Sequence, residues 1–597
     1  MTKLLAKIRD IYFNLLLWRI KHISDKNFVI ILGGVVGIVA GIAAVALKSV
    51  VHFIQGFLTG GFAVDYANIL HFIYPLVGIV LTVFLAKYLL RESLGHGITS
   101  ILFAISKNSS IIGAVKMYSR MVTSAITVGF GGSVGLEAPI VVTGSAIGSN
   151  IAQTMHLNYK QKTLLIGCGA AGAISAIFNS PIAGVIFAVE VLLAEVTITA
   201  FIPLLIASVF GQLISLMLLG EEILFSFQLK DPFAAADVPF YFLLGIACGL
   251  VSLYFTRCMY KIEDLISSIK GSFSKGVMGG IGLGLIIFLF PPIYGEGYDA
   301  IKLLLSEDGI GILNRSLFFN QIHSGLFLLL FMLGLIIMKP VATALTIGSG
   351  GSGGIFAPSL FLGGVTGFFF ATSYNYLALG QMLSISNFTL VGMCGVMSGV
   401  LHAPLTAIFL IAEITGGYTL FVPLMLVSAI SFITKTYFEK HSFYTKHLIE
   451  RGDLIQYDKD RQVLSLIHLK KIIETDLALI KPEDSLGDLV NLVRQSKRNI
   501  FPVVNDDQEL EGIVTLDDIR EIMFDEESRQ NVLVKSIMRN PPDKVSSHEK
   551  MQSVMNKFEK SGAWNLPVID EGKYVGFVSK SRIFNAYRKK LISQTPE

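Results

Sequence analysis

The stretch that decides the fold is Gly129–Pro139, which reads GFGGSVGLEAP. From Met121 to Tyr159, Glu137 is the only acidic or basic side chain other than histidine in a sequence that otherwise reads as membrane. A carboxylate there costs roughly 2.5 kcal/mol or more on insertion scales, which marks a candidate functional site. Glycine permits irregular backbone, which survives at membrane depth only inside protein or beside water. We therefore interpret the stretch as an anion site built from backbone amides, with a carboxylate where an anion would sit.

The same pattern recurs once in the second half of the chain. Gly351–Pro358 repeats Gly132–Pro139, and Pro404–Glu413 later echoes Pro181–Glu190. Two membrane halves with matching broken-helix signals indicate an internal-repeat transporter, with its site where the halves meet. Glycine-mediated helix packing is the alternative. It does not explain why the order Gly-x-x-x-Pro returns with a serine ahead of it.

The composition is that of a polytopic membrane protein with a soluble part attached. Of the 597 residues, 52% are hydrophobic and 15% charged, and the mean hydropathy is +0.64. The net charge of +4 suggests no nucleic-acid partner. Basic residues crowd the first 26 positions, so the positive-inside rule predicts a cytoplasmic N-terminus. The four cysteines lie apart and show no metal-ligand spacing, so no metal site is predicted.

Apolar segments divide the chain into domains. We expect an amphipathic cytoplasmic segment at 1–26, membrane repeats at 27–222 and 238–440, and a linker at 441–460. Several apolar segments are too short to cross ~30 Å of hydrocarbon as straight helices, which favours tilted and partial helices. The expected segments are 28–50, 70–90, 111–130, 136–155, 163–180, 182–197, 199–219, 238–269, 275–293, 323–345, 355–377, 387–401, 404–415 and 420–435.

The last part of the chain is charged and repeats internally. Phe501–Val504 is followed by Gly512–Thr515, and Leu566–Ile569 by Gly576–Ser579. Each copy reads as strand, turn, strand and helix. We therefore predict a pair of small α/β domains, at 461–525 and 526–597.

The membrane part resembles the CLC family of chloride channels and chloride/proton exchangers, over roughly residues 28–447. The resemblance rests on four pieces in family order: Gly95–Thr99 (GHGIT), Gly135–Pro139 (GLEAP), Gly354–Pro358 (GIFAP), and Tyr444 after the last span. The tail resembles a pair of CBS domains, which CLC proteins often carry. The fold class implied is a polytopic α-helical membrane protein, a CLC-like inverted repeat of tilted and partial helices, with a cytoplasmic α/β CBS-domain pair.

The resemblance also implies an anion pathway in which helix N-termini point at a dehydrated anion. A central anion would lie among the amides of Ile355 and Phe356 and the hydroxyl of Tyr444. An outer site would use the amides near Glu137, whose carboxylate is then both gate and proton carrier. We expect no other carboxylate in the membrane beside this glycine motif. The implied anion-binding set is His96, Gly97, Leu136, Glu137, Ala138, Gly354, Ile355, Phe356 and Tyr444.

The chain departs from the family pattern at three places. His96 stands where a serine that helps hold the central anion is common, so its imidazole either donates to the anion or turns away. Leu136 and Ala138 replace a common Arg and Gly, but their backbone amides are retained. Many exchangers have two successive glutamates near the inner mouth, whereas here Glu190 is followed by valine. Glu195, one turn further on, is a substitute candidate.

Some of these residues have simpler interpretations. Glu190 and Glu413 fit structural carboxylates that accept backbone N–H bonds. Tyr444 is alternatively an interfacial aromatic. For His96, packing competes with lining of the pore, and His402 fits a structural role.

In the tail, Gly512, Thr515 and Asp518 fit the pattern with which CBS domains bind a ribose. The second copy has Ser579 but carries Arg582 in place of the aspartate, and arginine cannot accept a hydrogen bond from a ribose hydroxyl. We expect one site for ATP, ADP or AMP, at Thr515 and Asp518, or a purely structural module.

The sequence thus predicts a homodimeric chloride transport protein in a plasma or inner membrane, with both termini cytoplasmic and a bacterial source. Chloride/proton antiport gated by Glu137 is favoured, and a passive, voltage-gated chloride channel is the alternative. No cofactor is required for either. An enzyme is not expected, because the membrane part shows no nucleophile–base pair, metal cluster or phosphate loop.

Overall fold

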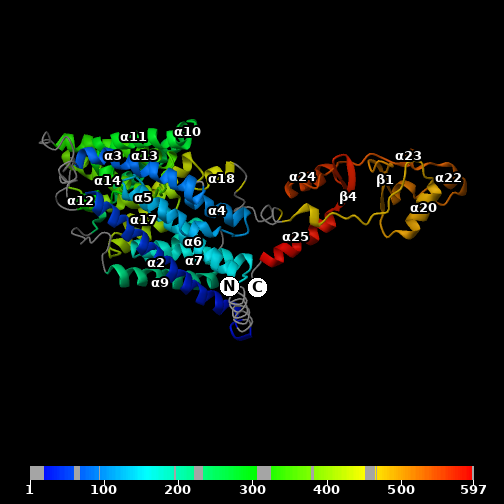
Figure 1. The fold of residues 1–597 in the computed structure, drawn as a ribbon, viewed down its shortest axis with the longest axis horizontal. Coiled ribbons are helices and arrows are strands. Elements are labelled where there is room, and N and C mark those ends of the chain that lie inside the picture. Colours follow the sequence, from blue (N-terminus) through cyan, green and yellow to red (C-terminus); the bar gives the residue numbers. More distant parts are fainter. Residues whose placement is uncertain are drawn as a thin grey trace. The chain divides into compact units, whose positions relative to one another are not determined.

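The computed structural model describes residues 19, 21–59, 67–92, 95–193, 197–220, 233–305, 325–377, 382–450, 453, 464 and 467–594. The chain divides into two compact units, Met1–Leu454 and Ile455–Glu597. Figure 1 shows helices in the described residues of the first unit, and short helices with hairpins in those of the second. Most of the predicted N-terminal segment 1–26, and 451–452 and 454–460 of the predicted linker, lie outside the described residues.

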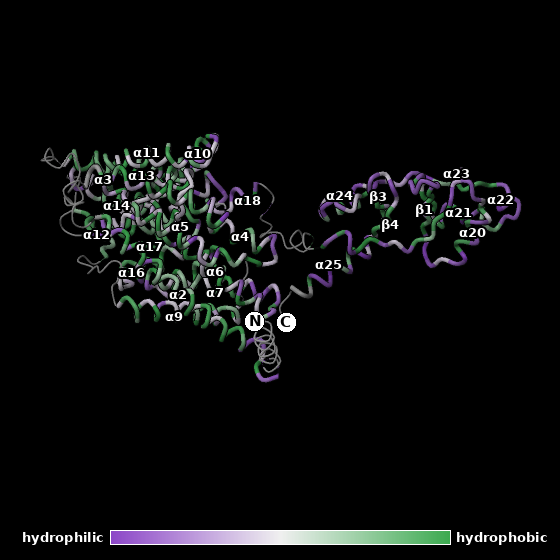
Figure 2. Tube along the Cα trace, viewed as in Figure 1, coloured by the Kyte–Doolittle hydropathy of each residue, from purple (hydrophilic) through white to green (hydrophobic). Residues whose placement is uncertain are grey.

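The first unit is built from long and short apolar helices, as Figure 2 shows by their hydrophobic colouring. Among the described residues, nine helices are long and apolar enough to cross a membrane. The α-helices are α2 (Asp25–Thr59), α3 (Ala67–Phe84), α4 (Gly97–Lys107), α5 (Ser119–Gly129), α6 (Glu137–Thr154), α7 (Tyr159–Phe178), α8 (Pro181–Phe187), α9 (Ile198–Leu219), α10 (Val238–Ser267), α11 (Ser272–Leu289), α12 (Tyr298–Leu305), α13 (Gly325–Gly348), α14 (Phe356–Tyr376), α15 (Ile385–Leu401), α16 (Pro404–Ile414), α17 (Phe421–Phe438) and α18 (Lys446–Glu450).

The predicted internal repeat is present in the structure, where α6, α7 and α8 correspond to α14, α15 and α16. In each half the glycine motif precedes a long helix, and two further helices joined by a tight reversal follow it. Asn179 and His402 occupy equivalent reversals in left-handed backbone, with φ of 54° and 55°. A proline then begins each short helix, where its missing N–H costs nothing. Repeated local sequence signals therefore produce repeated local structure, and His402 has the structural place expected of it.

The two glycine motifs form hydrogen bonds with each other and with residues that precede the other motif. The backbone of Gly135 pairs with that of Gly354 through N–H to O distances of 2.9 and 2.8 Å. The Ser133 N–H donates to the Thr346 hydroxyl at 3.3 Å, and the Ser352 N–H donates to the Thr127 hydroxyl at 3.0 Å. Residues that precede one motif thus satisfy the amides of the other. The repeat halves meet at the glycine motifs, as the sequence predicts.

Other glycines serve helix packing. A Cβ on Gly148 would lie 1.9 Å from the carbonyl oxygen of Leu165, and one on Gly367 would lie 1.9 Å from that of Phe388. These positions let α6 approach α7 and α14 approach α15 closely. Both interpretations of the glycines therefore apply, but to different positions: irregular backbone before the helices, and close packing within them.

Three details differ from the expected segments. The segment 111–130 is not one helix, because a 3-10 turn at Ala114–Met117 precedes α5. Within the expected membrane repeats, two short helices, α4 and α12, fall outside the expected segments. Each is short and ends or begins among polar residues, so hydropathy alone gives a weak signal.

The second unit contains two hairpins of the predicted type. In the first, β1 (Ile500–Val504) pairs antiparallel with β2 (Leu510–Thr515), followed by α21 (Leu516–Ile519). In the second, β3 (Asn565–Asp570) pairs with β4 (Lys573–Ser579), followed by α25 (Lys580–Gln594). The remaining helices are α20 (Leu486–Gln495), α22 (Glu526–Asn531), α23 (Val534–Ile537) and α24 (Met551–Ser561). Each hairpin has its own apolar core, so the α/β pair is confirmed.

Candidate anion pathway

Three helix N-termini converge on the glycine motifs. The bridge between Gly135 and Gly354 places the start of α6 beside the start of α14. A Cβ on Gly354 would lie 2.7 Å from the Cβ of Ala138, and one on Gly97 would lie 2.7 Å from Val142. The start of α4 is therefore also against the first turns of α6. First-turn amides have no partner within their own helix, so their N–H groups can bind an anion.

The predicted anion-binding residues lie at these helix starts. Leu136 is the residue before α6, and Glu137 and Ala138 open that helix. Ile355 is the residue before α14, and Phe356 opens it. The structure thus brings the motifs Gly135–Pro139 and Gly354–Pro358 together. That these residues bind an anion stays a prediction.

Tyr444, which follows α17 in the chain, is the last of the predicted anion-binding residues. Its side chain is buried, and its hydroxyl has no hydrogen-bond partner within the described residues. Its backbone carbonyl accepts from the Thr99 hydroxyl at 3.1 Å, which fixes it beside α4. A buried, unpartnered hydroxyl costs free energy unless something binds it. This placement suits a donor to an anion better than an interfacial aromatic.

Glu137 is enclosed beside these helix starts. Its side chain is 1% exposed, and the Tyr298 hydroxyl donates to Oε1. The backbone N–H of Ala357 is also directed at the carboxylate. A Cβ on Gly135 would lie 1.9 Å from Oε2, so the close approach requires glycine there. Oε2 has no hydrogen-bond partner among the described residues, so the carboxylate is held mainly through Oε1.

A second carboxylate contradicts the expectation that Glu137 stands alone. Glu296 Oε1 accepts from the backbone N–H of Leu136 at 3.3 Å. Glu296 lies between two apolar helices in the sequence GEG, where a charged residue reads as an ordinary loop. Tertiary folding returns this loop to the glycine motif, and the sequence pattern does not indicate which residues the loop will contact.

A buried lysine, Lys339, also lies beside the first glycine motif. Lys339 Nζ donates to the Ser133 hydroxyl at 2.9 Å and to the carbonyls of Ile293 and Gly295 at 3.3 and 3.4 Å. Its side chain is 0% exposed and lies over the ring of Phe361. The stretch 340–412, free of acidic and basic residues other than histidine, begins directly after it. The Lys339 amine is thus held by fixed oxygens beside the first glycine motif.

His96 is turned toward a carboxylate. Its Nε2 lies 3.0 Å from Oε2 of Glu263, and its ring meets that of Phe443 edge-on at 4.9 Å between centroids. His96 remains the residue before α4, so its position at the helix start is as predicted. Glu263, on α10, is a site residue that the sequence analysis missed, because it is one of several charges near a helix end.

Glu190 and Glu413 have the structural contacts expected of them. Glu190 accepts from the amides of Leu405 and Thr406 at 3.1 and 2.8 Å. Glu413 accepts from the amides of Ile182 and Ala183 at 3.0 and 2.8 Å. Each carboxylate therefore caps the short helix of the opposite repeat, where the helix dipole favours negative charge. Glu195 lies outside the described residues.

In the tail, Thr515 and Asp518 engage each other. The Thr515 amide and hydroxyl both donate to Asp518 Oδ2 at 2.7 Å, which caps α21. The Arg539 guanidinium lies 3.3 Å from the same oxygen. In the second copy, the Ser579 hydroxyl donates to Glu474 at 2.6 Å. Thr515 and Ser579 therefore have different partners in the two copies, and nucleotide binding stays a prediction.

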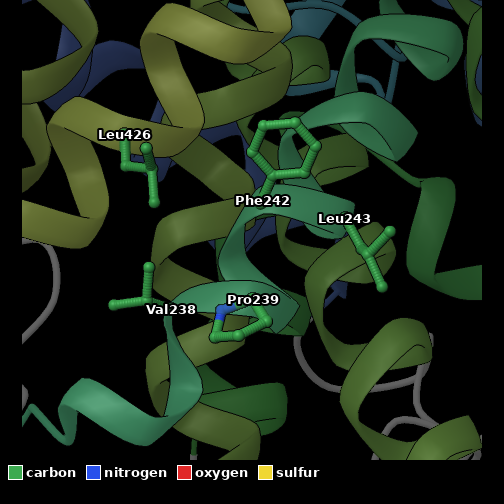
Figure 3. A pocket seen from close by; sticks show the side chains of 5 residues that line it. All are labelled: Val238, Pro239, Phe242, Leu243 and Leu426. Atoms are coloured by element: carbon green, nitrogen blue, oxygen red, sulfur yellow. The ribbon is translucent and has the colours of Figure 1, made fainter.

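An apolar hollow of about 500 Å³ is separate from this pathway. Figure 3 shows its lining, which comes from the start of α10 and from α17 and contains no polar side chain. The lining residues are Val238, Pro239, Phe242, Leu243 and Leu426. Without a donor it does not suit an anion, and its exposed apolar walls are of the kind that faces lipid.

Comparison with known proteins agrees with this architecture. Residues 78–436 match the family described as "Voltage gated chloride channel", and residues 469–525 and 534–589 each match the CBS domain. The chain therefore belongs to the CLC family, with a C-terminal CBS pair, as the sequence motifs predicted. CLC-type chloride transport across a membrane is the class of activity that this family defines.

Individual relatives are distant. The chain is 26% identical to a putative ClcB-like chloride channel protein of Ralstonia nicotianae, over 71% of this chain and 97% of that one. It is also 26% identical to chloride channel protein CLC-f of Arabidopsis thaliana, over 71% of this chain and 60% of the plant protein's length. Identity to an H(+)/Cl(-) exchange transporter, ClcA of Klebsiella pneumoniae, is likewise 26%, over 67% and 83%.

Solved structures share the fold. A slow cyanobacterial Cl-/H+ antiporter superposes with a TM-score of 0.63 at 22% identity, covering 72% of this chain and 99% of that one. A eukaryotic CLC transporter superposes with a TM-score of 0.59 at 18% identity, covering 94% and 99%. At these identities the likeness establishes the fold.

Proposed function

We propose that this protein exchanges chloride for protons, with Glu137 as gate and proton carrier. The observation that carries the proposal is the enclosed Glu137 carboxylate, which takes the Tyr298 hydroxyl and faces the Ala357 amide at the start of α14. Chloride competing for the same donors would displace the carboxylate, and protonation would release it. Anion entry and proton uptake are then linked at one residue.

The central anion in this proposal lies between the Tyr444 hydroxyl and the first amides of α14. Its support is the buried hydroxyl that no described residue satisfies. Neutral donors of this kind bind a dehydrated anion without holding it as tightly as a full charge would, so conduction remains fast.

The test of exchange is whether a chloride gradient alone moves protons, starting from equal pH on both sides of the membrane. Purified protein in sealed vesicles is given an outward chloride gradient, and pH outside is recorded. Exchange predicts that chloride leaving the vesicles drives protons inward, so the outside becomes alkaline until an uncoupler is added. Chloride efflux without any pH change would instead support the passive channel, which the missing second glutamate after Glu190 keeps as the second candidate.

We also propose a homodimer in a plasma or inner membrane, with both termini cytoplasmic. The basic residues of the first 26 positions support this orientation. Labelling of a cysteine introduced at Gln594 by an impermeant thiol reagent outside intact cells would contradict it. A bacterial source stays a prediction.

We expect His96→Ser to change the relative permeability of nitrate and chloride. The change removes an imidazole held by Glu263 and places a small hydroxyl at the start of α4, where it can face the anion. Bi-ionic reversal potentials from about pH 5.5 to about pH 8 measure the effect. Glu263→Gln is the matched control, because it keeps the imidazole and removes its charged partner. Unchanged permeabilities in His96→Ser would show that His96 does not line the path.

The CBS pair is proposed to bind one adenine nucleotide through Thr515 and Asp518. Asp518→Asn is expected to weaken binding at least about tenfold, because the amide can still cap α21 but loses the charge that accepts from ribose hydroxyls. Calorimetry of the full-length protein with ATP, ADP and AMP measures it. Ser579→Ala should bind as the unmodified protein does. Absence of binding by the unmodified protein would favour the structural module.

A further inference from the structure

The loop between α11 and α12 holds a carboxylate against the outer site. Glu296 accepts the backbone N–H of Leu136, the residue directly before Glu137. That amide belongs to the set predicted for the outer anion. Two carboxylates, from places far apart in the chain, therefore lie at the start of α6.

The backbone of the loop is fixed for this contact. Gly295 and Gly297, on either side of Glu296, both have left-handed backbone, with φ of +62° and +89°. A Cβ on Gly297 would lie 2.6 Å from the ring of Phe361. The Gly295 N–H donates to the Gly131 carbonyl at 3.2 Å. Residues with side chains are strained in this backbone, so the glycines determine where Glu296 points.

The same loop also reaches the proposed gate, Glu137. Tyr298, two residues after Glu296, donates its hydroxyl to Glu137. Moving Glu296 off the Leu136 amide would therefore disturb the group that holds Glu137. The two carboxylates are linked through one short segment as well as through their like charges.

Charged groups from several helices face Glu296. Glu137 on α6 repels its charge, while Lys48 on α2 and Lys339 on α13 attract it, and the Tyr298 hydroxyl lies on α12. Glu137 is almost fully buried, whereas Glu296 keeps partial exposure. Glu296 is therefore the less buried of the two carboxylates.

We propose that Glu296 is a second protonatable group of the outer gate. Charged, it holds the Leu136 amide and keeps an anion from that donor. When a proton from the outer solution binds the carboxylate, the neutral acid releases the amide, and an anion can take it. The proton leaves again when the carboxylate returns. This inference rests on the proposed exchange function, which it extends by a second group.

The test uses a variant in which the first gate no longer titrates. Chloride flux through Glu137→Gln is measured in proteoliposomes at fixed inner pH while outer pH is varied. We expect flux to rise at least about fivefold between outer pH of about 8 and about 5, as a single carboxylate becomes neutral. Glu137→Gln with Glu296→Gln should give a high flux that no longer depends on outer pH.

Two further variants separate titration from structural damage. Asp299→Asn in the Glu137→Gln background neutralises an exposed carboxylate three residues away and should leave the outer-pH dependence intact. Glu296→Asp keeps a carboxylate and should retain the dependence, even if Glu296→Gln proves too unstable to purify.

The outcomes distinguish this inference from the function it rests on. A flux through Glu137→Gln that is flat with outer pH would overturn the role of Glu296 and leave exchange through Glu137 standing. Persisting dependence in the double variant would also overturn it. Proton-coupled transport by Glu137→Gln would instead refute the proposed function itself.

Discussion

Glu137→Gln abolishes proton movement while chloride still flows down its gradient; this is the result expected if the protein is an exchanger. Glutamine keeps the size of the side chain but carries no transferable proton and no charge to compete with chloride. We expect proton flux to fall about 10²-fold or more, the scale of a positioned proton-transfer group. Parallel recordings with pH and chloride electrodes on the same vesicles measure both fluxes.

The structure explains why this residue should dominate. The Tyr298 hydroxyl donates to the carboxylate and the Ala357 amide faces it, and both are donors that would otherwise face an anion. In the glutamine variant these donors become free for chloride. Asp299→Asn, which alters an exposed acid in the first turn of α12, should preserve normal coupling. Retained proton-coupled transport in Glu137→Gln would contradict the assignment.

Glu190→Ala is expected to destabilise the membrane unit strongly. The change leaves the amides of Leu405 and Thr406 and the Thr406 hydroxyl without their acceptor. Unsatisfied donors cost about 1–3 kcal/mol each when buried, and the partial exposure of Glu190 reduces the total to about 2 kcal/mol. Loss of the folded fraction on heating, followed by size-exclusion chromatography in detergent, measures the effect.

The opposite repeat supplies the control for that prediction. Glu413→Ala removes the equivalent contacts with Ile182 and Ala183 and should destabilise the unit to a similar degree. Glu190→Gln keeps an acceptor, so we expect an intermediate stability and unchanged proton coupling. A stable Glu190→Gln that had lost proton transport would show that Glu190 carries protons instead of capping a helix.

The sequence predicted those parts of the site that local backbone chemistry determines. The glycines before α6 and α14 specify the irregular turns, and the prolines at 181 and 404 specify the starts of short helices. Because the motifs occur twice, the sequence also predicted that the two halves meet at them. Glu190 and Glu413 recur at equivalent positions of the two halves, and they were correctly interpreted as structural carboxylates that accept backbone N–H bonds.

The contacts made by Glu296 and Glu263 could not be predicted in this way. Each lies at a helix end or loop, where a charged residue needs no special explanation. Only the folded chain brings Glu296 to the Leu136 amide and Glu263 to His96. The glycines on either side of Glu296 are the one local signal that could have marked its loop as constrained.

The most direct test of coupled exchange is the reversal potential of the unmodified protein in a planar bilayer. A fixed chloride gradient is applied, and the potential is read with equal pH on both sides and again with a pH gradient. Exchange through Glu137 predicts that the reversal potential shifts when the pH gradient is imposed. A reversal potential that stays at the chloride equilibrium value under both conditions would contradict the account.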